Sequence, residues 1–174
     1  MDKIAKIFII VPSNVESSPV KGAAALANVL SEWVTVCFIT LKKVNDEFSL
    51  LNGNVEWVSL GGESSWIKRI KIIRSMIEAA GEKKAVATIS LALSADFVNS
   101  FCVNLALTFS SVRGNLPVVY VNTYGIIGKL IAYLHLKRLK KLTHVVSMTK
   151  VMSKQVEKYI GKSSPVIGNF IDEN

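Results

Sequence analysis

Short runs of consecutive apolar residues alternate along the chain with longer segments in which apolar residues recur every three or four positions. The short runs are typical of strands that are buried on both faces, and the longer segments are typical of amphipathic helices. This pattern predicts strands at residues 6–11, 35–40, 55–60, 85–90, 117–122, 144–148 and 165–167. It predicts helices at residues 21–31, 64–80, 94–112, 124–142 and 150–159.

The order of these elements predicts an α/β fold in which strand and helix alternate. We expect a doubly wound, mostly parallel sheet of about seven strands with helices on both faces. The 174 residues, half of them apolar, are enough for one domain with a large core, so residues 1–174 are interpreted as a single domain. Ligands of such a sheet bind in the crevice outside the carboxyl ends of the strands, where segments 12–22, 91–96 and 123–128 are predicted to lie.

Several classes of protein are disfavoured by what the chain lacks. No run of about 18 apolar residues is present and the first residues do not resemble a signal peptide, which predicts a cytoplasmic protein. Cys37 and Cys102 have no metal-ligand or disulfide spacing, so we expect reduced core cysteines and no metal site. No cofactor is expected in this domain. His135 and His144 lie far in sequence from any candidate nucleophile, which argues against a Ser-His-Asp enzyme.

The charge of the chain indicates an anionic partner. A net charge of +8 and an isoelectric point near 9.5 fit a nucleic acid, an anionic lipid or a phosphorylated substrate. Aromatic residues are few and are not interleaved with a basic tract, which argues against nucleic acid. An anionic lipid surface and a phosphorylated ligand therefore stay open.

The loop after the first predicted strand contains the first group of candidate binding residues. Gly22 lies at the start of an Ala-rich helix, where free N–H groups attract phosphate or sugar hydroxyls and the missing Cβ permits close approach. Ser13, Asn14 and Lys21 belong to the same loop. The glycine patterns of dinucleotide and triphosphate loops are absent. The alternative is that Gly22 only relieves helix packing.

The end of the fifth predicted strand, residues 117–122, contains the second group. Asn122, Thr123 and Tyr124 place hydrogen-bonding side chains at its carboxyl end. Because Asn cannot take a proton at neutral pH, Asn122 is predicted to orient a hydroxyl rather than to act as a general base. A plain turn with a helix cap explains Asn122 and Thr123 almost as well.

Two helices are predicted to touch an anionic membrane. In the helix at 64–80, the face opposite the core stripe carries both cations and isoleucines: Ile67, Lys68, Lys71, Ile72 and Arg74. Exposed isoleucines beside cations are typical of helices that lie on a lipid surface. The alternative interpretation is an ordinary solvated face with two surface isoleucines.

The helix at 124–142 is apolar nearly all round until its last turns, which gather four cations: Lys137, Arg138, Lys140 and Lys141. Cations at a helix C-terminus complement the helix dipole, but four exceed what the dipole requires. We therefore expect this cluster to assist membrane contact.

Three short motifs resemble the N-terminal domain of family 4 glycosyltransferases of the GT-B fold. They are Lys21-Gly22-Ala23, Ala95-Asp96, and the segment 145–172, in which a strand ending in Ser, a helix and a short strand precede an Asn-Gly-x-Asp-like sequence. In this chain Phe170 stands where the family more often has Gly, whereas Asp172 keeps its place. Asn122 or Thr123 likewise stands where family members often have His or Asp.

The resemblance implies the acceptor-binding half of a retaining glycosyltransferase in bacterial cell-surface polysaccharide synthesis. Such an enzyme moves a sugar from a nucleotide diphosphate sugar to a glycan or lipid-linked acceptor, often at the inner face of the cell membrane. The donor site belongs to a second, C-terminal domain, which is expected beyond Asn174. On this interpretation the chain alone is inactive, and no catalytic residue is assigned within it.

Two other classes of function stay open. One is a stand-alone flavodoxin-like or Rossmann-like binding or regulatory module, which would bind its ligand without a partner domain. The other is a monotopic membrane adaptor that uses the basic helices and performs no chemistry. A reading frame that continues for about one further domain would favour the transferase.

Overall fold

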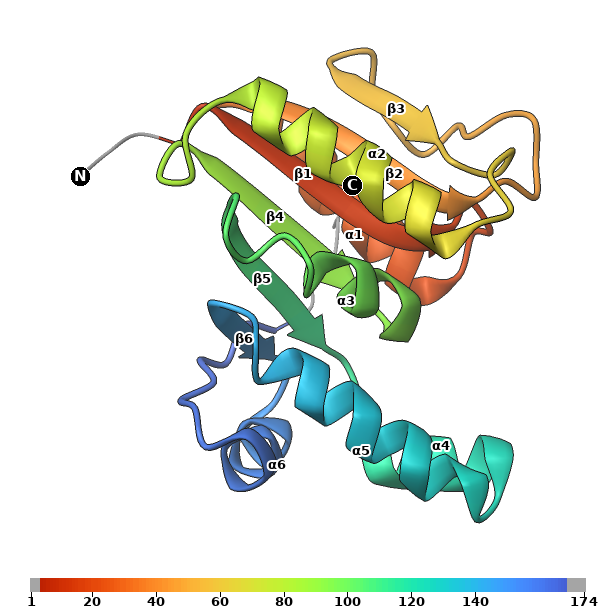
Figure 1. Ribbon diagram of the computed structural model, residues 1–174, viewed down its shortest axis with the longest axis vertical. Coiled ribbons are helices and arrows are strands. Elements are labelled where there is room, and N and C mark those ends of the chain that lie inside the picture. The colour runs from red at the N-terminus through yellow and green to blue at the C-terminus, as the bar shows by residue number, and fades with distance from the viewer. Residues whose placement is uncertain (1–3, 169–174) are drawn as a thin grey trace.

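Six parallel strands form one sheet in the computed structural model, which describes residues 4–168 (Figure 1). The strands are β1 (Lys6–Ser13), β2 (Thr35–Lys42), β3 (Val55–Ser59), β4 (Val86–Leu91), β5 (Leu107–Val112) and β6 (His144–Ser147). Their order in the sheet is β3-β2-β1-β4-β5-β6, so the strand order reverses between β1 and β4. This arrangement confirms the predicted doubly wound α/β fold.

Residues 4–168 also contain six helices, of which five lie between strands and the sixth follows the last strand. They are α1 (Ser18–Leu30), α2 (Trp66–Ala80), α3 (Leu93–Asn99), α4 (Leu116–Tyr124), α5 (Ile127–Leu139) and α6 (Lys150–Ile160). Successive side chains of a strand point to opposite faces, and β1 uses both. Ile7 and Ile9 pack with α1, whereas Phe8 and Ile10 pack with α2 and α3. Helices on both faces thus bury the central strands.

A third apolar cluster attaches the end of the chain to the sheet. Leu136 and Leu139 of α5 pack with Val156 and Ile160 of α6 around Val145 of β6. The first part of α5 lies beside α4, and in Figure 1 this pair extends away from the sheet. We call residues 116–139 the α4–α5 hairpin. No residue of α4 is buried, whereas α5 buries Gly128, Ala132, His135, Leu136 and Leu139.

The predicted fifth strand at 117–122 is wrong, because this segment is helix α4. The Asn115 side chain accepts a hydrogen bond from the backbone N–H of Val118 at 3.2 Å, and Pro117 lies in the first turn. A capping Asn and an early Pro start a helix in spite of the β-branched residues that follow. The local preference of Val for strands is overridden here.

The predicted helix at 94–112 is also wrong in its second half. Helix α3 ends at Asn99, and Leu107–Val112 form β5 between β4 and β6. The predicted seventh strand at 165–167 is only a single bridge between Val166 and Ser147, so the sheet has six strands. The other predicted strands and helices are present, with ends shifted by a few residues.

Candidate functional site

A cavity of about 300 Å³ lies outside the carboxyl ends of β4 and β5. The β4–α3 turn and the segment after β5 form two of its walls, and Pro19 of α1 closes one side. Tyr120 and Tyr124 of α4 and His135 of α5 form the remaining wall. This is the place where doubly wound sheets bind their ligands.

Three side chains from three helices form a hydrogen-bonded chain in the wall of the cavity. His135 Nε2 lies 2.7 Å from Asp96 Oδ2, and His135 Nδ1 lies 2.7 Å from the Tyr120 hydroxyl. Asp96 is 1% exposed and His135 is 2% exposed. Paired buried polar groups of this kind hold their elements in one arrangement. We call these residues the Asp96–His135–Tyr120 chain.

Further hydrogen bonds to side chains of β4 and α3 fix the position of Asp96. The Ser90 hydroxyl donates to Asp96 Oδ1 at 2.6 Å, and Asn99 Nδ2 donates to Ser90 Oγ at 2.9 Å. Asn99 also donates to the carbonyl of Phe109 at 3.0 Å and accepts from the Thr88 hydroxyl at 2.6 Å. All four polar side chains are buried, and their hydrogen bonds join α3 to β4 and β5. The carboxylate of Asp96 therefore has a fixed orientation.

The protonation of Tyr120 follows from its surroundings. Burial, the charge of Asp96 and the neighbouring Tyr124 raise the pKa of Tyr120 well above its ordinary value, so the hydroxyl keeps its proton at neutral pH. A neutral His135 with its proton on Nε2 satisfies the chain, because Nε2–H donates to Asp96 and Nδ1 accepts from Tyr120. The phenolic oxygen then has lone pairs left for a hydroxyl group in the cavity.

Arg113, directly after β5, contributes positive charge to the same cavity. Its Nε atom is buried without a hydrogen-bond partner, and Arg113 forms no ion pair within residues 4–168. Burial lowers its pKa, although the guanidinium stays charged at neutral pH. The guanidinium lies over Gly22 of α1, where an added Cβ would come within 2.7 Å of Nη1. Gly22 therefore gives Arg113 its space beside the start of α1.

The backbone of the β4–α3 turn is strained at the edge of the cavity. Ala92 has φ of 73°, which is a left-handed conformation that side chains disfavour. It lies directly before α3 and lines the cavity. Strain of this kind often accompanies binding sites.

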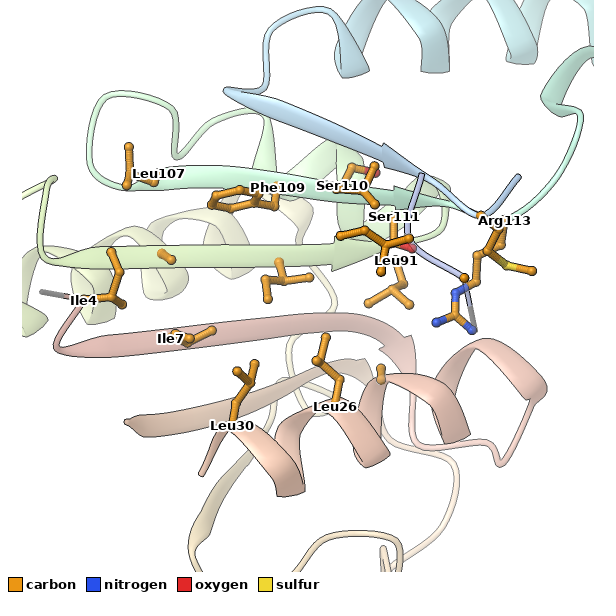
Figure 2. A pocket seen from close by; sticks show the side chains of 17 residues that line it. Ile4, Ile7, Leu26, Leu30, Leu91, Leu107, Phe109, Ser110, Ser111 and Arg113 are labelled. Atoms are coloured by element: carbon orange, nitrogen blue, oxygen red, sulfur yellow. The ribbon is translucent and has the colours of Figure 1, made fainter. Parts of the chain in front are cut away.

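A second cavity of about 380 Å³ lies on the α1 side of β4 and β5. Figure 2 shows Leu26 and Leu30 of α1 on one side of it and Phe109 of β5 on the other. Its lining is almost entirely apolar, with Ser110, Ser111 and Arg113 as the polar exceptions. Because it lacks a set of oriented polar groups, we assign the candidate site to the first cavity.

The structure places three of the predicted site residues at the candidate site. Asp96 and Tyr124 line the cavity. Gly22 lies under Arg113, so the group that approaches it is a side chain of the protein rather than a backbone segment.

The other predicted cleft residues lie elsewhere or have structural partners. Asn14 is buried and joins two loops, since it donates to the carbonyl of Asn45 at 2.6 Å and accepts from Val44 N–H. Lys21 pairs with Glu16 at 3.5 Å. The hydroxyl of Ser13 accepts a weak hydrogen bond from the N–H of Val15. None of these three lines the cavity.

Asn122 and Thr123 are exposed on α4, and the Thr123 hydroxyl donates to the carbonyl of Val119. Their predicted place at a strand end is wrong because the strand itself was misassigned. The actual strand end carries Arg113, Gly114 and Asn115.

Tyr120, His135 and Arg113 were missed by sequence reasoning. Tyr120 was assigned to a strand, and His135 was interpreted as an ordinary helical residue. One sequence signal for Arg113 existed, since Gly114-Asn115-Leu116-Pro117 has the composition of a turn followed by a helix start. That signal would have placed Arg113 at the end of a strand.

The basic face predicted on α2 is not continuous. Ile72 packs against the core, and Arg74 donates to the carbonyl of Phe101 and pairs with Glu78. Ile67, Lys68 and Lys71 are exposed, and Lys68 Nζ lies 3.8 Å from a carboxylate oxygen of Glu63.

At the end of α5 the four predicted cations differ in their surroundings. The guanidinium of Arg138 lies over the rings of Phe97 and Phe101, at 4.8 and 4.9 Å from their centroids. Lys137, Lys140 and Lys141 are exposed. The basic character of this end of the helix therefore comes mainly from the three lysines.

Residues 4–168 contain neither a metal-ligand cluster nor a membrane-spanning helix. That part of the chain has no group of three or more His, Cys, Asp or Glu side chains suited to a metal ion. Within the same residues, no helix combines the length and the apolar character that crossing a bilayer requires.

The comparisons with protein-family models and with curated proteins find no match for this chain. The fold therefore defines a class rather than a family: a Rossmann-like domain with a six-stranded parallel sheet. The cavity at the carboxyl edge of its strands is the candidate site of this domain.

Proposed function

We propose that this domain is the acceptor-binding half of a retaining glycosyltransferase that transfers a sugar from a nucleotide diphosphate sugar to a glycan or lipid-linked acceptor. The observation that carries the proposal is that two polar groups line the same cavity. They are the Tyr120 hydroxyl, oriented by His135, and the guanidinium of Arg113, which forms no ion pair within residues 4–168. The first group suits a sugar hydroxyl and the second suits a phosphate. A lipid-linked glycan carries both.

The roles of the site residues follow from their contacts. The Tyr120 oxygen accepts a hydrogen bond from an acceptor hydroxyl, while His135 and Asp96 keep the phenol in place. Arg113 binds the diphosphate that joins a glycan to its lipid, since a guanidinium forms paired hydrogen bonds with phosphate oxygens. These residues position the acceptor, and the sugar donor belongs to a second domain that faces the cavity. Asn169 to Asp172, part of the motif that suggested this family, lie outside the described residues.

A first prediction concerns the donor. This chain is expected to show no micromolar binding of uridine or guanosine diphosphate sugars in a calorimetric titration, because the proposed donor site is in another domain. Micromolar binding would contradict the assignment as an acceptor half. It would favour the stand-alone nucleotide-binding module instead.

A second prediction concerns Arg113. Titration with a monosaccharide linked through diphosphate to a short polyprenol should show binding that Arg113→Ala weakens at least about tenfold, the effect of losing a charged hydrogen bond. Gly22→Val should act in the same direction, because the valine side chain would displace the guanidinium. Binding of the free monosaccharide should be unchanged in both variants.

Lys21→Ala is the matched control for Arg113→Ala. Lys21 is an exposed cation next to Gly22, pairs with Glu16 and does not line the cavity. Equal weakening by Lys21→Ala and Arg113→Ala would mean that the ligand responds only to overall charge. That result would remove Arg113 from the proposed site.

A further inference from the structure

The tip of the α4–α5 hairpin exposes large apolar side chains. Ile126, in the turn that joins the two helices, is 85% exposed, and Ile127, the first residue of α5, is 67% exposed. Tyr124, Leu130, Tyr133 and Leu134 are each at least half exposed on the same hairpin. Contiguous apolar surface of this kind marks an interaction site, whereas single exposed apolar residues need no explanation.

The packing of the hairpin accounts for its inner side only. Gly128 lets α5 approach the backbone of α4, and Ala132, His135 and Leu136 of α5 are buried. The exposed apolar residues lie outside the core clusters formed by residues 4–168. A helix that is apolar nearly all round requires a second apolar environment for its outer side.

The distribution of charge identifies that environment. Residues 97–156 contain eight Lys and Arg residues and no Asp or Glu, and the rest of the chain carries equal numbers of each sign. The whole net charge of +8 therefore belongs to this segment. Lys129 lies just behind the apolar tip, and Lys137, Lys140 and Lys141 lie at the far end of α5.

We propose that the α4–α5 hairpin is a membrane-docking element whose apolar tip enters the interface of an anionic phospholipid bilayer, with the lysines behind it paired to lipid phosphates. An apolar surface bordered by cations alone is the pattern of interfacial helices on anionic lipid. The occupant lies outside the candidate cavity, and the inference does not rest on glycosyl transfer. It places the main membrane contact on the hairpin rather than on α2.

Vesicle sedimentation tests the apolar part of the contact. The protein should sediment with vesicles of phosphatidylglycerol and phosphatidylcholine at low salt, and less so with phosphatidylcholine alone or at high salt. Ile126→Asn with Ile127→Asn should lower the partition coefficient about tenfold or more, because two exposed isoleucines no longer enter the apolar region. Val29→Asn with Val44→Asn, at two exposed valines outside the hairpin, is the matched control and should bind like the wild type.

Charge variants separate the two basic regions. Replacement of Lys129, Lys137, Lys140 and Lys141 with Gln should abolish most of the salt-sensitive binding. Replacement of Lys68, Lys71 and Arg74 with Gln should leave most of it. The proposal is overturned if the α2 set carries the binding, if both isoleucine and valine pairs weaken it equally, or if the wild type stays in the supernatant.

A fluorescent label at the tip reports insertion directly. Both native cysteines are buried, and burial raises the pKa of each thiol to about 12, so a labelling reagent should react with an introduced exposed cysteine. An environment-sensitive dye on Ile127→Cys should brighten and shift to the blue when anionic vesicles are added, and a dye on Val29→Cys should not. A lipid-independent response at position 127 with dimer formation in solution would instead identify a second copy of the chain as the occupant.

Discussion

His135→Ala is expected to lower the free energy of unfolding by about 3 kcal/mol, because it takes one hydrogen-bond partner from the buried carboxylate of Asp96 and removes a buried side chain. The substitution leaves the carboxylate of Asp96 buried with Ser90 as its remaining hydrogen-bond partner. It also removes the acceptor of the Tyr120 hydroxyl and leaves a cavity between α3 and α5. Urea denaturation followed by circular dichroism measures the loss.

His144→Ala is the matched control for this prediction. His144 is exposed and stacks on Phe109 with ring centroids 4.9 Å apart, a contact that contributes about 0.5–1.5 kcal/mol. Asp96→Asn with His135→Ala should recover part of the stability, because no buried charge is then left without a partner. If His135→Ala is no more destabilising than His144→Ala, the Asp96–His135–Tyr120 chain does not hold the helices together.

Gly128→Ala is expected to destabilise the protein by about 2 kcal/mol or more, although Ala normally favours a helix by about 1 kcal/mol over Gly. A Cβ at this position would lie 2.7 Å from the backbone nitrogen of Val121 and would collide with the carbonyl of Tyr120. Because backbone atoms cannot rotate away, α4 must move off α5. Thermal unfolding measures the loss, and the same displacement should weaken ligand binding at Tyr120.

Gly62→Ala serves as its control. Gly62 lies in an exposed turn, and nothing lies within 4 Å of an added Cβ there. Its effect on the free energy of unfolding should stay within about 0.5 kcal/mol, as for other surface substitutions. If Gly128→Ala is equally neutral, the two helices are not in close contact at that point.

The central sheet could be predicted because strands such as β1 and β2 contain short runs of consecutive apolar residues. Runs such as Ile7–Val11 and Val36–Ile39 are apolar on both faces, and only a strand covered by helices on both sides buries them fully. The same reasoning failed at Val118 and Val119, where a short β-branched run lies in a helix that is half exposed. The capping Asn115 and Pro117 make that segment a helix, and neither residue contributes to the apolar periodicity from which strands are predicted.

Most of the candidate site was beyond prediction for a different reason. Asp96 and His135 are separated by 39 residues and Tyr120 and His135 by 15, so their contact depends on how α3, α4 and α5 are placed. The contact between Gly22 and Arg113 likewise joins distant segments. Asp96 was found because its motif was local. Because the fifth strand was placed at residues 117–122, the side chains expected at its end were Asn122 and Thr123. The strand in fact ends at Val112, directly before Arg113.

The Asp96–His135–Tyr120 chain joins the hairpin to the body of the domain as well as lining the cavity. Tyr120 is on α4, His135 is on α5, and Asp96 is anchored to β4 through Ser90. Any force on the hairpin tip is therefore transmitted to the phenol that faces the cavity. If binding to a bilayer favours one tilt of the hairpin, the bilayer raises or lowers the affinity of the cavity for its ligand by some factor. Thermodynamic reciprocity then requires the ligand to change the affinity for the bilayer by the same factor.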